Sequence, residues 1–108
     1  MTEKQIEWLK NLKPFKTSED IPSIPRASTE EEQQLIIDCL VRCGAIPKKD
    51  LIKGQRYLGS CRNNSEAIWN GECFDYQRTK FGYTYWTTIK HFEDECYFDV
   101  FIPIKKLN

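Results

Sequence analysis

The chain has one histidine, and three acidic residues follow it closely: His91 precedes Glu93, Asp94 and Glu95. Proton-transfer catalysis needs a base held near a nucleophile or a metal, so a small enzyme that uses His91 is one hypothesis. Consecutive charges after a predicted strand are more typical of a solvated turn. We therefore favour a solvated turn at this position and assign no catalytic residue.

The five cysteines are the next candidates for chemistry. Cys61 stands beside Arg62, whose positive charge would favour the thiolate, but the predicted strand register turns this side chain inward. Cys39 and Cys43 lie one helical turn apart, yet no CxxC pair accompanies them, as zinc sites usually require. We predict buried, reduced thiols, no metal and no cofactor.

Basic and aromatic residues interleave between positions 53 and 90, where six basic residues face three acidic ones in a chain whose sixteen basic and sixteen acidic residues cancel. Aromatic rings on a curved sheet can stack on bases while cations hold phosphates. Binding of nucleic acid or a nucleotide on the sheet face is therefore an alternative hypothesis. Two expectations weaken it, since the aromatics are assigned to the core and Arg62 is placed beside Glu66. The candidate ligand-binding residues are Arg56, Arg78, Lys80 and Trp86.

Arg78 shares the predicted face of Tyr76 and so should lie at the rim of the core. Its guanidinium could pair with the acidic segment 93–95 or grip an anionic ligand. The internal ion pair is the favoured interpretation.

Two helices are predicted in the first half of the chain. Residues 3–13 carry a loose apolar stripe that Pro14 ends, and a proline-rich, extended arm follows. Ser28 and Glu31 form a capping box, which predicts a helix over 29–43 with Gly44 as its stop.

The second half is rich in aromatic and β-branched residues and predicts a small antiparallel sheet. Asn70-Gly71 indicates a two-residue hairpin turn that sets Trp69 opposite Glu72. A three-residue loop before it would pair Cys61 with Ala67 and Gly59 with Trp69. These registers place Arg62, Glu66 and Asp75 in one outer row of charges, and put the aromatic residues on one inner face. That inner face comprises Tyr57, Gly59, Cys61, Ala67, Trp69, Phe74 and Tyr76.

A further strand is predicted from Tyr83 to about Ile89, followed by an acidic loop. The last strand, CYFDVFIPI, alternates cleanly and should lie at an edge or finish at Pro103, because proline cannot donate to a ladder. On the outer face, Leu58 and Ile68 form an apolar strip that the helix over 29–43 or a partner must cover. With Trp8 and Leu12 of the first helix, they are the candidate partner-binding residues.

A chain of 108 residues is one domain by its size, and we divide it into a helix and arm, 1–27, and an α+β domain, 28–108. The expected fold is α+β: an N-terminal helix and extended arm, one capped helix, and a curled, barrel-like antiparallel sheet of four to five strands. No apolar stretch is long enough to cross a bilayer, and the N-terminus is too charged for a signal peptide, so we expect a cytoplasmic protein.

From CRNNSEAIWNG through FDYQRTKFG to DVFIPIKKL, the chain resembles a group of short, uncharacterised bacterial and bacteriophage proteins. The shared elements are Cys-Arg-Asn, Ala-x-Trp, Phe-x-Tyr-x-Arg-x-Lys-Phe-Gly and Asp-Val-Phe-x-Pro, over roughly residues 51–107. The resemblance implies a phage or prophage setting and no particular activity. The leading hypothesis is a non-enzymatic binding protein, an accessory factor or inhibitor that acts by contact with another protein.

Overall fold

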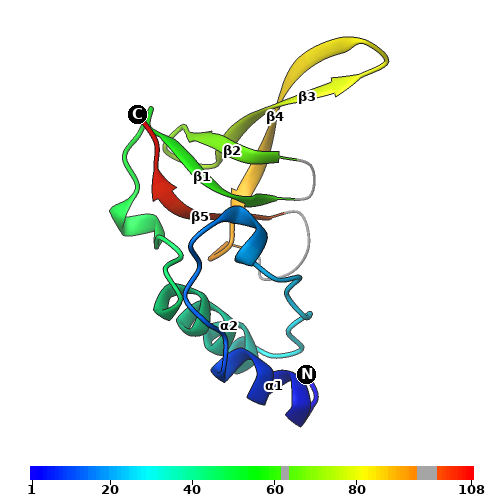
Figure 1. The fold of residues 1–108 in the computed structure, drawn as a ribbon, viewed down its shortest axis with the longest axis vertical. Helices are drawn as coiled ribbons and strands as arrows, with labels where there is room; N and C mark the ends of the chain where they lie inside the picture. The colour runs from blue at the N-terminus through cyan, green and yellow to red at the C-terminus, as the bar shows by residue number, and fades with distance from the viewer. Residues whose placement is uncertain (62–63, 95–99) are drawn as a thin grey trace.

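The computed structural model describes residues 1–61, 64–94 and 100–108. It shows two α-helices and five strands in these ranges, with the helices below a ring of strands in Figure 1. The α+β class is confirmed. The elements are α1 (Glu3–Lys10), α2 (Glu30–Arg42), β1 (Arg56–Cys61), β2 (Asn64–Trp69), β3 (Phe74–Lys80), β4 (Tyr83–His91) and β5 (Val100–Lys106).

The five strands close into a ring in the order β1-β2-β3-β4-β5, and β5 pairs back with β1. Four neighbouring pairs are antiparallel, but β4 and β5 run parallel. The predicted curled sheet is confirmed, whereas its antiparallel character is wrong for this one pair. Parallel neighbours need a crossover that returns the chain to the same end of the sheet. After β4 the chain turns at residues 92–94, and residues 95–99 lie outside the described ranges.

α1 is shorter than the predicted helix over 3–13. It ends at Lys10, and the Asn11 side-chain amide donates to the Glu7 carbonyl at 2.9 Å, which caps the last turn. The longer helix, α2, has 13 residues. In the described ranges, no helix combines the length and the apolar character needed to cross a membrane.

The start of α2 is displaced by one residue from the predicted cap. The Thr29 hydroxyl accepts from the Glu32 amide at 3.1 Å, and the Ser28 amide donates to the Glu32 carboxylate at 2.8 Å. The predicted capping pair of Ser28 and Glu31 is therefore wrong by one position. Thr29 and Glu32, each one residue further along, offer the same kinds of side chain for capping hydrogen bonds. At the other end, Gly44 has the predicted left-handed conformation, with φ of +116°.

The β1–β2 hairpin has a different register from the predicted one. Ala67 lies opposite Tyr57 and not Cys61, a displacement of four residues, so Trp69 does not cover Gly59. Because side chains alternate with a period of two, the even displacement leaves Tyr57 and Ala67 on their predicted face, and the register then shifts between Leu58 and Cys61. The loop residues 62–63 lie outside the described ranges, as does the side chain of Cys61.

Asn70 shapes the β2–β3 turn through its side chain. We predicted Trp69 opposite Glu72, but Trp69 pairs with Phe74, and the chain from Asn70 to Cys73 forms the connection. The Asn70 Oδ1 accepts from the amides of Glu72 and Cys73, both at 2.9 Å. This use of asparagine to mimic a backbone turn displaces the register by two residues, again an even number.

Side chains from all five strands, most of them aromatic, fill the ring. Ring centroids lie 4.9 Å apart for Trp69 and Phe74, and 4.6 Å apart for Phe74 and Phe101. The prediction that the aromatic residues from Tyr57 to Tyr76 pack inside is confirmed. This inner core comprises Tyr57, Ala67, Trp69, Phe74, Tyr76, Ile89 and Phe101.

β5 separates this core from a second one. Phe101 enters the ring, while Val100 and Ile102 face the other way, as the alternation predicted. Pro103 does not end the strand, because β5 continues along β1 to Lys106, but it lies where β5 no longer pairs with β4, so the predicted edge position is confirmed locally. Proline is tolerated there because the ladder between β4 and β5 has already ended at Phe101.

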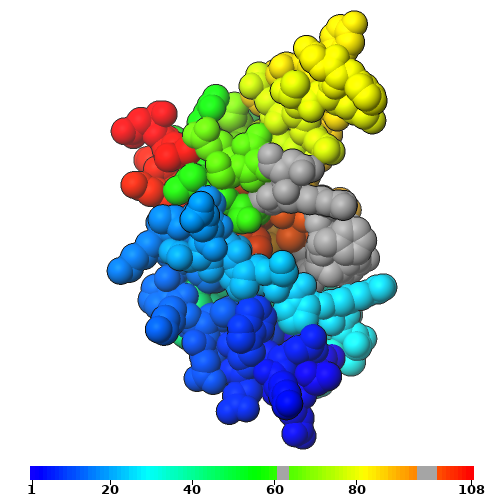
Figure 2. Space-filling view, turned by 45° about the vertical axis from the view of Figure 1, so that its right-hand side comes forward, coloured from blue at the N-terminus to red at the C-terminus, as the bar shows by residue number. Residues whose placement is uncertain are grey.

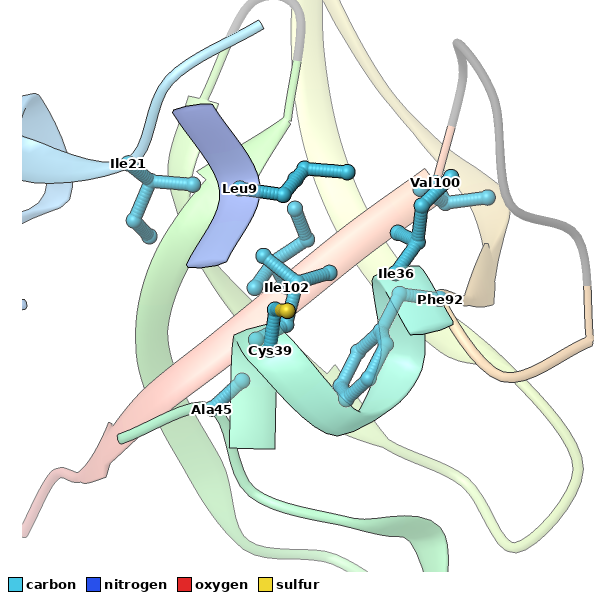
Figure 3. Packing of buried hydrophobic residues seen from close by; sticks show 9 residues of the cluster. Leu9, Ile21, Ile36, Cys39, Ala45, Phe92, Val100 and Ile102 are labelled. Atoms are coloured by element: carbon cyan, nitrogen blue, oxygen red, sulfur yellow. The ribbon is translucent and has the colours of Figure 1, made fainter. Parts of the chain in front are cut away.

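The second core packs the helices and the arm onto the outer side of β5 (Figure 3). Leu9 of α1 is completely buried in it, and Ile21 of the arm is 9% exposed. Segment 1–27 therefore packs against the rest of the chain, and the boundary at residue 28 stays a prediction. The cluster comprises Leu9, Ile21, Ile36, Cys39, Leu40, Ala45, Phe92, Val100 and Ile102.

Gly59 lies where β1 comes closest to β5. A Cβ atom at this position would stand 2.2 Å from the Ile102 carbonyl oxygen and 2.8 Å from Cζ of Phe101. The oxygen belongs to the backbone of the strand that closes the ring and cannot swing away. Glycine is therefore required for the two strands to meet.

We predict that Gly59→Ala lowers the free energy of unfolding by about 1–3 kcal/mol, because the methyl group forces β1 and β5 apart. Urea unfolding measures the change. Ser60→Ala, on the same strand, is the matched control and should stay within about 0.5 kcal/mol of the wild type. Equal stability of Gly59→Ala and the wild type would contradict the close approach.

Candidate functional site

The β3–β4 hairpin leaves the ring and projects from the body of the molecule (Figures 1 and 2). Its pairing is uninterrupted from Phe74 opposite Ile89 to Lys80 opposite Tyr83. Burial ends part of the way along, and β3 is exposed from Gln77 onward. The outer part of the hairpin is therefore a two-stranded ribbon outside the core.

Four aromatic side chains are exposed on this ribbon. The exposed fractions are 88% for Phe81, 77% for Tyr83, 55% for Trp86 and 39% for Tyr85. Single exposed aromatics are ordinary, but a group on one projecting element indicates a binding surface. Of these four residues, only Trp86 is among the candidates predicted from the sequence. A signal was present in the sequence, because Tyr85 and Trp86 are adjacent on a strand and cannot both point into the ring.

One face of the ribbon combines cations and tyrosines. Arg78 lies opposite Tyr85, and Lys80 lies opposite Tyr83, so these side chains continue the face of Tyr76 beyond the core. All four are exposed. We call Arg78, Lys80, Tyr83 and Tyr85 the cationic face.

The sequence has no acidic residue between Asp75 and Glu93, so the charged residues in the outer part of the hairpin are all basic. The Lys80 ammonium stands 5.5 Å from the centroid of the Phe81 ring at the tip. The whole chain has a formal net charge of zero, so the cationic face is a local excess of positive charge. A local patch of this kind is what binding of a polyanion requires of a neutral protein.

The opposite face of the hairpin borders a hollow of about 350 Å³ on the outside of the ring. Trp86 lines it together with Arg56 and two carboxylates, Glu66 and Asp75. The acids make this hollow a poorer site for an anion than the cationic face.

The four predicted ligand-binding residues are thus not brought together. Arg78 and Lys80 lie on the cationic face, whereas Arg56 and Trp86 lie at the hollow on the other side. Register decides this division, because Trp86 pairs with Gln77 and so points away from Arg78.

The outer apolar strip is half-buried. Leu58 pairs with Glu66, and Ile68 pairs with Asp75 on its β3 side. The predicted row of Arg62, Glu66 and Asp75 is therefore wrong for its last pair, because the β2–β3 register differs by two residues. Arg62 lies outside the described ranges.

The remaining predicted partner-binding residues lie in and after α1. Leu12 is half-buried against the second core, and its carbonyl accepts from the Arg42 guanidinium at 3.3 Å and from the Cys43 thiol at 3.4 Å. Trp8 is 40% exposed. Of the two, Trp8 is the more accessible to a partner.

His91 is completely buried, so the prediction of a solvated turn is wrong for this residue. Its Nε2 lies 2.9 Å from the Ile46 carbonyl oxygen, and its Nδ1 accepts from the Glu93 amide at 3.1 Å. Both contacts are satisfied by the neutral ring with its proton on Nε2. The rings of Phe74 and Phe92 cover it at centroid distances of 6.0 and 4.2 Å. A group held in this way has no access to a substrate.

The acidic turn after His91 is bound to Lys48. The Lys48 amide donates to the Glu93 carboxylate, and its ammonium pairs with Asp94, which is exposed as predicted. Arg78 was predicted to pair with the acidic segment 93–95, and Glu95 of that segment lies outside the described ranges. The described part of this turn therefore fixes the segment before β1 to the end of β4.

The described cysteines show thiols and no disulfide. Cys39 and Cys43 are buried, and Cys73 is half-buried. Burial raises the pKa of the Cys43 thiol, which keeps it protonated. In the residues that the structure describes, no cluster of three or more histidine, cysteine or acidic side chains could hold a metal ion.

Comparisons of the chain with family models, curated proteins and solved structures find no match. The function therefore has to be inferred from the site itself.

We predict that the free energy of unfolding falls as the pH drops below 6.5. Burial lowers the pKa of His91 from its usual 6.5, so below that pH the unfolded chain takes up a proton that the folded chain resists. The contribution of neutral His91 to the free energy of unfolding is fully present well above pH 6.5. It is lost toward lower pH, with a slope of at most about 1.4 kcal/mol per pH unit. Urea unfolding between about pH 7.5 and pH 5 measures it.

His91→Gln is the control, because glutamine keeps a donor and an acceptor but does not titrate. Its stability should change much less over the same window. The hydrogen bond from the Lys16 amide lowers the pKa of Asp20 from 3.8, and the hydrogen bond from the N-terminal amine lowers the pKa of Glu32 from 4.5. Both carboxyl groups therefore titrate below this pH window. An equal fall in the variant and the wild type would exclude His91 as the cause.

Proposed function

We propose that this protein is a non-enzymatic binding protein that holds single-stranded nucleic acid on the cationic face of the β3–β4 hairpin. The observation that supports the proposal is the cross-strand pairing of Arg78 with Tyr85 and of Lys80 with Tyr83, with all four side chains exposed. Aromatic rings in such settings stack on bases, and neighbouring cations hold the phosphates. One surface of the ribbon thus offers both kinds of contact.

The spacing of the tyrosines suits this role. Tyr83 and Tyr85 point the same way and are separated by roughly 6.7 Å along β4. Each ring can therefore take one base without crowding the other, while Arg78 and Lys80 lie beside them on β3. Stacking contributes about 1–3 kcal/mol per base, so the two rings supply most of the affinity and the two cations a smaller, salt-dependent part.

The hairpin answers both objections that the sequence raised against nucleic-acid binding. The first was that the aromatics belong to the core, which holds for residues such as Trp69 and Phe74 but not for Tyr83 and Tyr85. The second was that Arg62 is neutralised, and the cationic face does not include it. For this reason we place nucleic-acid binding ahead of the protein-contact hypothesis.

The proposal includes no catalysis. His91, the base of the enzymatic alternative, is enclosed by the inner core and has both ring nitrogens occupied. A location in the cytoplasm and a role as a phage or prophage accessory factor, both expected from the sequence, belong to the same proposal. In that compartment single-stranded nucleic acid is available as a ligand for the cationic face.

We predict that the double variant Arg78→Gln and Lys80→Gln binds a fluorescent oligothymidine of about 15 nucleotides more weakly and with less salt dependence. Each phosphate neutralised on a single strand contributes about −0.7 to the slope of log affinity against log salt, so two cations give about −1.4. Fluorescence anisotropy between about 50 and 200 mM salt measures this slope, which should approach zero in the variant.

The matched control removes two charges elsewhere, with Lys10→Gln at the end of α1 and Lys13→Gln just after it, both exposed. Its affinity and salt slope should equal those of the wild type. Loss of the slope in both double variants would show that the charges act without a defined site. No binding of the oligonucleotide by the wild type at low salt would reject the proposal.

Contact with another protein is a second candidate function, and the outer face of the ring favours it. Trp86 is 55% exposed beside a hollow that also contains Arg56, and half-buried Leu58 and Ile68 lie on the same face. Tryptophan and arginine are enriched among the residues that dominate protein interfaces. A photo-crosslinking residue in place of Trp86 should then capture a protein that the same residue in place of Ile52, which is 51% exposed, does not. Identical products from the two positions would argue against this surface.

A further inference from the structure

The tip of the hairpin holds a phenylalanine in a conformation that phenylalanine disfavours. Phe81 and Gly82 form the two-residue turn with φ of +51° and +82°, and Phe81 is the one described residue other than glycine with a positive φ. Turns of this type prefer asparagine or glycine at the first position, and a bulky side chain there is strained. Strain of this kind costs of the order of 1–3 kcal/mol.

The Phe81 side chain does not repay this strain through packing. It is 88% exposed, the largest exposed fraction among the large hydrophobic residues described, and its close partner is the Lys80 ammonium at 5.5 Å. The tip is also open, because an atom added at Gly82 would meet nothing within 4 Å. The fold would be served as well or better by an asparagine, so the ring is placed for something outside the chain.

We infer that Phe81 is a wedge that inserts at the junction between paired and unpaired nucleic acid, so that the hairpin prefers a forked end to a continuous single strand or duplex. The inference rests on the proposed function, and it names which nucleic acid the site takes. Proteins that bend or open nucleic acid insert apolar side chains between base steps, at a cost of a few kcal/mol per unstacked step. At a fork the terminal pair already presents an open face, so that cost is smallest.

The order of side chains along the ribbon matches such a junction. Phe81 leads at the tip, Lys80 and Tyr83 come next as a cross-strand pair, and Arg78 with Tyr85 follows one step further back on the same face. A ring at the tip can stack on the last base pair while the two tyrosines take the unpaired bases that follow. The cations then lie beside the phosphates of that strand. The tip of the ribbon is free to approach a fork because it extends beyond the rest of the molecule (Figure 2).

Phe81→Asn tests the inference, because it removes the ring and creates the favoured Asn-Gly turn. We expect it to bind a forked DNA with an oligothymidine arm about tenfold more weakly than the wild type, and to bind the free oligothymidine equally well. A 2-aminopurine placed as the first unpaired base, which stacks on the duplex end in the free fork, should brighten when the Phe81 ring takes its place on the last pair, and should not brighten with the variant. The thermal midpoint of the variant should equal or exceed that of the wild type.

Two further variants, and the comparison of forked with free probes, make the outcomes distinct. Phe81→Trp keeps a large ring and should retain the fork preference, whereas Tyr83→Ala should weaken binding to both probes. Equal affinity of the wild type for the forked and free probes, or of Phe81→Asn and the wild type for the fork, overturns the wedge and leaves the proposed function standing. Failure of the wild type to bind either probe overturns the proposed function itself. If Phe81→Asn is less stable than expected, Phe81→Gly at the same position gives the same test.

Discussion

The structure depends on the contact of β1 with β5 at Gly59, because this contact closes the ring. The Ile102 carbonyl occupies the space that any side chain at Gly59 would need. A ring of five strands has a narrow interior, and it is filled by the aromatic side chains of Tyr57, Trp69, Phe74, Tyr76 and Phe101. Additional aromatic side chains therefore have no place inside. The outer parts of β3 and β4, with Tyr83 and Tyr85, must extend beyond the ring, and their exposure follows from its closure.

Much of this fold could be predicted from the sequence, and the reason is parity. The registers we expected were displaced by two and four residues, yet Tyr57, Ala67, Trp69 and Phe74 all point inward as predicted. A period of two records which face a side chain takes but not which residue lies opposite it. The loop chemistry of Asn70, where an amide oxygen accepts two backbone hydrogens, chose between registers that the pattern allowed equally.

What could not be predicted depends on contacts between distant segments. The burial of His91 follows from the crossover to a parallel β5 and from the Ile46 carbonyl, which belongs to the segment before β1. No local pattern distinguishes this histidine from one in an exposed turn. The site residues stay a prediction, but the register shows how they lie: Arg78 and Lys80, both predicted to bind a ligand, share one face of the hairpin. Trp86 was predicted to belong to the same site. It lies opposite Gln77, the residue next to Arg78 on β3, so its side chain is on the opposite face of the hairpin.

The separation of the hairpin from the core has a consequence for how binding and stability relate. Side chains such as Tyr83 and Phe81 bury almost nothing in the fold, so their replacement leaves the inner core unchanged. The ribbon is held at its base, where Phe74 and Ile89 pair within the ring, and a two-stranded ribbon has little stability of its own. The interior packing therefore sets the position of the base, while the turn residues set the shape of the tip. In such an arrangement the strained Phe81 can be kept without weakening the core, and affinity for a ligand can change at the tip independently of the fold that presents it.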